Sequence, residues 1–296
     1  MAVTVIEQLR RDVVSDLLSM SSVSANWPRW RSLIRLHADR LSTDTVLGLG
    51  DHLSEIFLST RGDGGREQGS LAGGGAGWEA LVCWYLNFCL IGSNAIVLKK
   101  KSDVPKCVRD ALRVSYSNVV ANSESDLVAV TLPDDVILPQ ALRERRAEVA
   151  AQLGAIAASK FDDLRVAVVQ CKTNWNDNAQ IPMLWDIVYL AESFPENRVR
   201  VGTTQYSLSS LRSFKYSFAT VPTQRDPIVA GSTAVSRVMH LSGGNYWGRP
   251  SENQVASSMK EIFAKAEIGP GGGRGLRNLL RLELPRVASH YDYFDL

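Results

Sequence analysis

The run LRVAVVQCK at residues 164–172 constrains the fold more than any other stretch of this chain. It is apolar at nearly every position through AVV, which is typical of a strand in the middle of a sheet that is covered on both faces. Positions two apart on a strand point to the same face, so Gln170 and Lys172 should stand side by side, with Cys171 on the opposite face. A lysine is seldom buried without a reason. Either this strand ends at the surface, or the pair has a function.

The segments around this strand alternate between strand and helix patterns. A strand-like run, SDLVAVTL (125–132), comes before it, and a helical segment that begins at Pro139 separates the two. A helix over IPMLWDIVYLAES (181–193) and a third strand, RVRVGTTQYSL (198–208), are expected after it. Such alternation predicts an α/β fold with a central mixed β-sheet flanked by helices. The central strand then ends where α/β proteins place their sites.

Composition narrows the class of protein. The chain has 296 residues, is 45% hydrophobic and carries a formal net charge of +2, as expected of a globular protein. Its longest apolar run, LVCWYLNFCLIG (81–92), is interrupted by Asn87 and is too short to span a bilayer, so it predicts a buried helix. The opening residues show no charged start followed by an apolar segment. No secretory signal is therefore expected, and a cytoplasmic location is predicted.

Metal-binding patterns are not evident among the cysteines and histidines. The four cysteines form no CxxC pair or Cys/His cluster, which predicts reduced thiols and no zinc site. The four histidines (His37, His52, His240 and His290) show no ligand spacing and are expected to be surface or hydrogen-bonded residues. Two basic runs, 99–113 and 273–281, are either phosphate-contacting surfaces or ordinary solvated faces.

Two acidic residues are available to meet the Gln170–Lys172 pair. Asp126 opens the 125–132 run, so an antiparallel pairing of the two strands would bring it beside Gln170 and Lys172. Glu79 lies in the first turn of the apolar helix expected over residues 78–92. Each residue also has a structural explanation, because acids favour helix N-termini, Asp often occupies turns and Lys can snorkel at a strand end.

An Asp, then a Glu or Gln, then a Lys two residues further on is the pattern of the PD-(D/E)xK nuclease superfamily. Residues 78–206 resemble that superfamily in its QxK variant, and the QCK spelling is similar to that of Mrr-type restriction nucleases. The resemblance implies a restriction-endonuclease-like core and Mg²⁺-dependent hydrolysis of phosphodiester bonds. It implies that Asp126 binds the ion with help from the backbone carbonyl of Cys171, and that Lys172 orients or activates the attacking water.

The sequence departs from the family pattern at two positions. Gln170 stands where an acid is usual, and its amide oxygen can ligate or hydrogen-bond but supplies no charge. The missing charge would come from Glu79, a recurring helix acid in many restriction endonucleases, or from Glu124. Ser125 replaces the proline before the first acid. These departures leave the number of metal ions open.

Three further segments suit contacts to DNA. The polar turn after the central strand, the stretch MHLSGGNYWGRPSEN (239–253) and the loop GPGGGRG (269–275) carry side chains that bind bases or phosphates. The candidate residues are Asn174, Asn176, Asn245, Tyr246, Trp247, Arg249 and Arg274. For 239–253 the alternative is a tight turn packed by two aromatic rings, and for 269–275 it is a flexible surface loop.

The predicted function is a Mg²⁺-dependent, sequence-specific endonuclease of double-stranded DNA, of the type II restriction class. A homodimer is expected because two strands of a symmetric site must be cut. A cognate DNA methyltransferase is expected as a genetic rather than a physical partner. One alternative is a defence or repair nuclease without sequence specificity. The other, which the neutral Gln170 motivates, is a DNA-binding or assembly protein that keeps the fold but lacks the chemistry.

The expected organisation is one compact domain with four regions. These are a helical N-terminal region (1–60), a flexible glycine-rich loop (61–77), a nuclease core (78–210) and C-terminal recognition and dimerisation elements (211–296).

Overall fold

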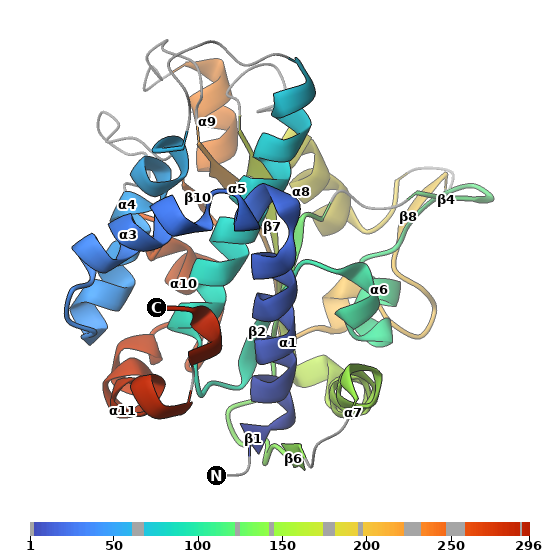
Figure 1. Cartoon of the computed structure of the whole chain (residues 1–296). Helices are drawn as coiled ribbons and strands as arrows, with labels where there is room; N and C mark the ends of the chain where they lie inside the picture. Colours follow the sequence, from blue (N-terminus) through green and yellow to red (C-terminus); the bar gives the residue numbers. More distant parts are fainter. Residues whose placement is uncertain are drawn as a thin grey trace.

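A five-stranded mixed sheet forms the centre of the molecule (Figure 1). The computed structural model describes residues 3–60, 68–121, 125–141, 145–173, 181–194, 198–221, 232–246, 258–290 and 292–296. The strands lie in the order β10 (Asn245–Tyr246), β9 (Ser213–Thr220), β7 (Arg165–Lys172), β5 (Leu127–Thr131) and β2 (Ala95–Leu98). The α/β class and the central mixed sheet are therefore confirmed.

Strand direction decides which residues meet at each end of the sheet. β5 runs antiparallel to both β2 and β7, whereas β7, β9 and β10 are parallel. The start of β5 therefore lies at the same end as the C-terminal ends of β2, β7 and β9. β7 is buried from Arg165 to Cys171, so the apolar run correctly predicted a central strand.

Helices cover both faces of this sheet. They are α1 (Val5–Ser19), α2 (Ser21–Ser24), α3 (Trp27–His37), α4 (Thr43–Leu58), α5 (Gln68–Cys89), α6 (Lys106–Ala111), α7 (Arg146–Ser159), α8 (Ile181–Ala191), α9 (Thr233–Met239), α10 (Glu261–Lys265) and α11 (Leu276–His290). In Figure 1, α1 and α5 cross in front of β2 and β7. On the other face, Tyr189 of α8 packs its ring against Phe214 and Tyr216 of β9.

The helical N-terminal region is confirmed by α1 to α4. Ser42 begins α4 with a capping box, because its Oγ accepts the Thr45 N–H at 3.1 Å and the Thr45 hydroxyl accepts the Ser42 N–H at 2.9 Å. Two small sheets lie outside the central one. β1 (Val3–Thr4) pairs with β6 (Gln140–Ala141), and β3 (Val114–Tyr116) lies between β4 (Val119–Ala121) and β8 (Val199–Val201).

The expected third strand is wrong in its extent and its place. Only Val199–Val201 of the 198–208 run is a strand, and it belongs to the small sheet with β3. Gly202 follows with φ of +83°, a conformation that ends the extended run. The strand beside β7 is instead β9, SFKYSFAT, whose aromatic residues at alternate positions face α8.

Three region boundaries also need correction. α5 begins at Gln68, so the expected glycine-rich loop is helical from there to residue 77, while 61–67 lie outside the described residues. β9 and β10 complete the central sheet, so no structural boundary falls at residue 210. The helix expected from Pro139 begins at Arg146.

None of the helices among the described residues is long and apolar enough to cross a lipid bilayer. All four cysteines are buried, and none is joined in a disulfide.

A buried ion pair fastens α1 to the rest of the fold. Arg10 is fully buried, and its Nε lies 3.1 Å from both carboxylate oxygens of Glu7. The same guanidinium donates to Asn87 Oδ1 of α5 at 3.3 Å and to the Ala95 carbonyl of β2 at 2.9 Å. Glu7 in turn accepts the Gly92 N–H at 3.1 Å. This network joins α1 to the helix and strand that carry the candidate site.

Replacing Arg10 with alanine should lower the free energy of unfolding by about 3–5 kcal/mol, because Glu7 would remain buried without its partner. Urea unfolding followed by circular dichroism measures the change. The matched control is Arg277→Ala, whose exposed ion pair with Asp44 should contribute less than about 1 kcal/mol. Equal losses in the two variants would contradict the proposed importance of the network.

Candidate active site at the end of the central sheet

The Asp126 carboxylate is held at the junction of β5 and β7. The two strands pair antiparallel with Leu127 opposite Val169, which is the condition under which Asp126 was expected to reach Gln170 and Lys172. Asp126 therefore lies one residue before β5 and beside the end of β7. Asp126 Oδ2 accepts the backbone N–H of Cys171 at 2.7 Å. This hydrogen bond continues the pairing of β5 and β7 one residue beyond the start of β5. It holds the Asp126 carboxylate beside the end of β7.

Burial raises the pKa of the Asp126 carboxyl above its usual range. The charge of Lys172, the Cys171 N–H and the charge of Lys99 lower this pKa, and the charge of Glu79 raises it. The electrostatic surroundings of Asp126 therefore consist of one further acid and two lysines. The charges of Lys172, Lys99 and Glu79 all act on Asp126 at this end of the sheet.

Lys172 and Cys171 take the positions that the strand pattern predicted. Lys172 is half-buried at the C-terminal end of β7, whereas the Cys171 thiol is buried. Burial raises the pKa of that thiol well above its ordinary value, and the charges of Asp126 and Glu79 add to the effect. The N–H and C=O of a strand residue point to the same side. The Cys171 carbonyl therefore points toward the edge occupied by Asp126.

Gln170 is fully buried, which explains why this position carries a neutral amide and not a carboxylate. Its Oε1 accepts a hydrogen bond from the Tyr216 hydroxyl at 2.8 Å, on the face of the sheet that α8 covers. An ionised carboxylate at this position would lose its hydration without gaining a cation among these contacts. Gln170 therefore serves as the hydrogen-bond acceptor of a buried tyrosine.

Glu79 is the other acid whose charge acts on Asp126. It lies on α5 next to Trp78, whose indole N–H donates to the Ala219 carbonyl of β9 at 3.1 Å and fixes the helix over the sheet. The Glu79 carboxylate forms an ion pair with Lys99, and both side chains are 22% exposed. Glu124, the other candidate, lies outside the described residues.

Lys99 is the residue that sequence reasoning missed. It was counted in the basic run 99–113, because the strand β2 just before it, AIVL, has only four residues and therefore too short a pattern to be recognised as a strand. β2 is antiparallel to β5, so its C-terminal end lies beside the start of β5 and brings Lys99 to Asp126.

Thr220 is a second residue at this end of the sheet that was not predicted from the sequence. It stands in register with Lys172, and its buried hydroxyl has no hydrogen-bond partner among the described residues.

The three expected DNA-contacting residues that the structure describes, Asn245, Tyr246 and Arg274, do not gather at this site. Asn245 and Tyr246 are buried in β10, where Asn245 Nδ2 donates to the Val238 carbonyl at 3.1 Å and the Tyr246 ring stacks on Trp78. A base contact needs an exposed side chain, so this expectation is wrong for both residues. Asn174, Asn176, Trp247 and Arg249 lie outside the described residues.

Arg274 is exposed but lies at the opposite end of the sheet. The GPGGGRG turn that carries it is fastened by the Gly269 N–H, which donates to Thr131 Oγ1 at the end of β5, and by Arg165 at the start of β7, which donates to the Gly269 carbonyl. The length of β7 therefore separates this turn from the site, roughly 23 Å at 3.3 Å per residue. A flexible loop is also wrong here, because the turn is tied down by these hydrogen bonds.

The residues of this site fit a magnesium ion. Mg²⁺ prefers oxygen ligands and needs only one or two carboxylates, because it keeps several waters. Asp126 and the Cys171 carbonyl face the same edge, and the Glu79 carboxylate lies close enough for its charge to act on Asp126. Lys99 and Lys172 supply positive charge on the two sides of this acidic pair.

No protein-family model matches this chain, and a search of curated proteins finds no similar sequence. The function must therefore be inferred from the site itself.

Replacing Asp126 with asparagine should stabilise the protein at neutral pH when divalent metal ions are removed. The native pKa of Asp126 is raised, so between the unfolded value of about 3.9 and the native value the folded state binds more protons. Stability contributed by this group falls as the pH rises through that window. The advantage of Asp126→Asn should thus appear above the window and vanish as the pH approaches 4.

Melting temperatures of wild type and variant, measured in a chelator from pH 4 to pH 8, test this expectation. Asp135→Asn is the matched control, because Asp135 is exposed and substitutions at such positions usually change stability by less than about 0.5 kcal/mol. A gap between wild type and Asp126→Asn that does not change with pH would contradict the explanation.

Replacing Gln170 with glutamate should lower the free energy of unfolding by about 1–3 kcal/mol, because a carboxyl group would be buried against Tyr216. Urea unfolding at neutral pH measures the change. Gln140→Glu is the matched control, since Gln140 is exposed in β6. Wild-type stability in Gln170→Glu would mean that the position accepts an acid and that burial does not explain the glutamine.

Proposed function

We propose that this protein is a Mg²⁺-dependent endonuclease of double-stranded DNA whose active site is formed by Asp126, Glu79, Lys172 and the Cys171 carbonyl. The observation that carries the proposal is the hydrogen bond of 2.7 Å between Asp126 Oδ2 and the Cys171 N–H. This hydrogen bond joins Asp126 to the QxK segment, Gln170–Lys172, in one oxygen-rich cluster. The two parts of the motif are 44 or more residues apart in the sequence. The resemblance to PD-(D/E)xK nucleases rests on these same residues.

Each residue has a distinct role in this proposal. Bound Mg²⁺ supplies a Lewis acid that neutralises charge on the phosphate and stabilises the leaving oxygen. Asp126 would hold the ion through its carboxylate, whose Oδ2 accepts the Cys171 N–H. The Lys172 ammonium donates hydrogen bonds that orient the attacking water and offset the negative charge of the transition state.

Lys99 positions Glu79 in this scheme. The ion pair between them holds the carboxylate at the end of the sheet, so Glu79 adds the negative charge that Gln170 lacks. Gln170 does not touch the reacting groups in the proposed arrangement. It positions the end of β7 through its hydrogen bond with Tyr216.

Sequence-specific cleavage of the type II restriction class is the form of the activity that we favour. The enzyme would act in the cytoplasm as a homodimer on a symmetric site, beside a cognate DNA methyltransferase as its genetic partner. A nuclease without sequence specificity would use the same residues. A protein that binds DNA without cutting it is favoured by one observation: Glu79 is already paired with Lys99, which leaves Asp126 as the carboxylate best able to hold an ion.

Lys172→Ala should reduce Mg²⁺-dependent cleavage of plasmid DNA by at least about 100-fold, because it removes a charge that acts in the transition state. Binding to the same DNA, measured by fluorescence anisotropy with Ca²⁺ in place of Mg²⁺, should change little. Lys160→Ala is the matched control, because Lys160 is exposed just before the other end of β7.

The same digestion separates the candidate functions. Discrete plasmid fragments support the site-specific enzyme, whereas a smear supports the non-specific nuclease. Binding without cleavage in both Mg²⁺ and Mn²⁺ would reject the enzyme and favour the DNA-binding protein. Cleavage by Lys172→Ala at the wild-type rate would reject the assigned site.

A further inference from the structure

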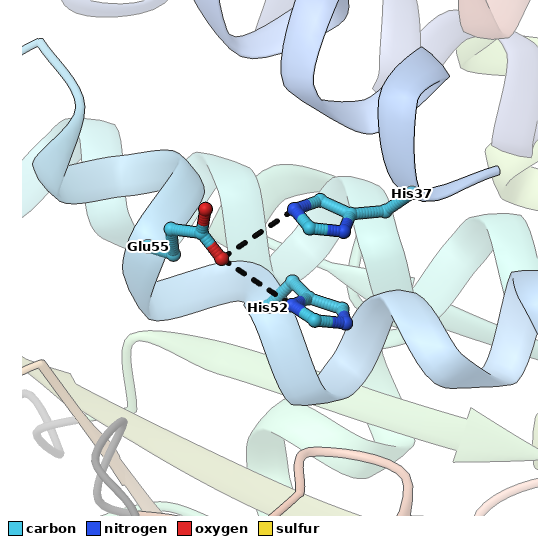
Figure 2. Close-up of side chains that lie close together, drawn as sticks. All are labelled: His37, His52 and Glu55. Atoms are coloured by element: carbon cyan, nitrogen blue, oxygen red, sulfur yellow. Dashed lines mark hydrogen bonds and ion pairs between the residues drawn. The ribbon is translucent and has the colours of Figure 1, made fainter. Parts of the chain in front are cut away.

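Two histidines and a glutamate meet where α3 ends against α4, although their sequence positions gave no such indication (Figure 2). His37 is the last residue of α3, and His52 and Glu55 lie three residues apart on α4, so they share one face of that helix. The two imidazole rings stack with centroids 3.7 Å apart and planes 11° from parallel. Both rings point toward the same carboxylate oxygen of Glu55 (Figure 2).

The distances from Glu55 to the two histidines suit ligands that share one ion, and the stacked rings would turn so that the ion lies in both ring planes. His37 Nε2 lies 3.4 Å and His52 Nδ1 lies 3.3 Å from Glu55 Oε2. Two ligands bound tetrahedrally at 2.0–2.1 Å from zinc are themselves about 3.3 Å apart. All three ligand atoms lie within 4.8 Å of one another.

The cluster also leaves polar groups without adequate partners. His37 Nε2 is shielded from solvent and has no hydrogen-bond partner among the described residues, although it faces the carboxylate. No lysine or arginine within the described ranges forms an ion pair with Glu55. One bound cation would satisfy the nitrogen and the carboxylate together.

We propose that His37, His52 and Glu55 bind a divalent transition-metal ion of the zinc class, with water completing the coordination. Imidazole nitrogens suit zinc and its neighbours in the first transition row, whereas Mg²⁺ prefers oxygen ligands. The His52 and Glu55 side chains are 41% and 59% exposed, so the ion can enter from solvent and keep a water ligand. The ion would cross-link α3 to α4. The proposal does not depend on the nuclease assignment.

Zinc binding to the full chain, prepared without an affinity tag and stripped with a chelator, tests the proposal. Competition with a chromogenic zinc indicator should show one equivalent bound by the wild type, and excess Mg²⁺ should not displace it. His37→Ala and His52→Ala should each weaken this binding by more than the roughly 10–100-fold that loss of an outer-shell partner costs. His240→Ala should bind as the wild type does, because His240 is exposed on the turn after α9.

Two further measurements keep the result interpretable. Zinc should raise the melting temperature of the wild type and of His240→Ala but not of the two cluster variants. Glu55→Gln preserves the shape of the exposed side chain, and its fold can be checked by circular dichroism before its weaker zinc binding is measured. Equal zinc stoichiometry and affinity in the wild type and the His37→Ala/His52→Ala double variant would overturn the proposal. Absence of tight zinc binding in the wild type would overturn it as well.

Discussion

The antiparallel register between β5 and β7 is the constraint on which the candidate site depends. Leu127 lies opposite Val169, and this places the Asp126 carboxylate at the Cys171 N–H. A slip by one residue would turn every side chain of β5 to the other face of the sheet. Because both faces are packed by helices and every residue of β5 is buried, such a slip would bring side chains of the wrong size against each helix layer. The packing of α5 and α8 therefore protects the geometry of the site.

Charge at this end of the sheet is balanced by residues from four different elements. Glu79 comes from α5, Lys99 follows β2, Asp126 precedes β5 and Lys172 ends β7. No two of these residues are neighbours in sequence, so the cluster exists only in the folded chain. Gln170, whose amide carries no charge, is buried against Tyr216. The buried Gln170 thus completes the hydrogen bonding of the core, whereas the half-buried residues of the site carry its charges.

The two proposed ion sites differ in the chemistry of their ligands. The end of the sheet offers carboxylate and carbonyl oxygens, which suit Mg²⁺, and the α3–α4 contact offers imidazole nitrogens, which suit zinc. The buried Glu7–Arg10 pair connects α1 with α5 and β2, the elements that carry or precede Glu79 and Lys99. In the N-terminal region, α1 is therefore part of the scaffold of the sheet, and α3 and α4 supply all three residues of the second site.

The sequence by itself determined the α/β class and the central strand β7, because apolar continuity and alternation are local signals. It offered the meeting of Asp126 with the end of β7 only for an antiparallel pairing, which the tertiary structure supplies. It did not determine that β9 is the parallel neighbour of β7, that α5 begins at Gln68 or that Asn245 and Tyr246 are buried. Short strands such as β2 carry too few residues for a clear pattern, so Lys99 could not be separated from the basic run around it. The pairing of His37 with His52 and Glu55 likewise depends on how α3 packs against α4. Contacts between distant elements are decided by packing of the whole core, and only the tertiary structure contains that information.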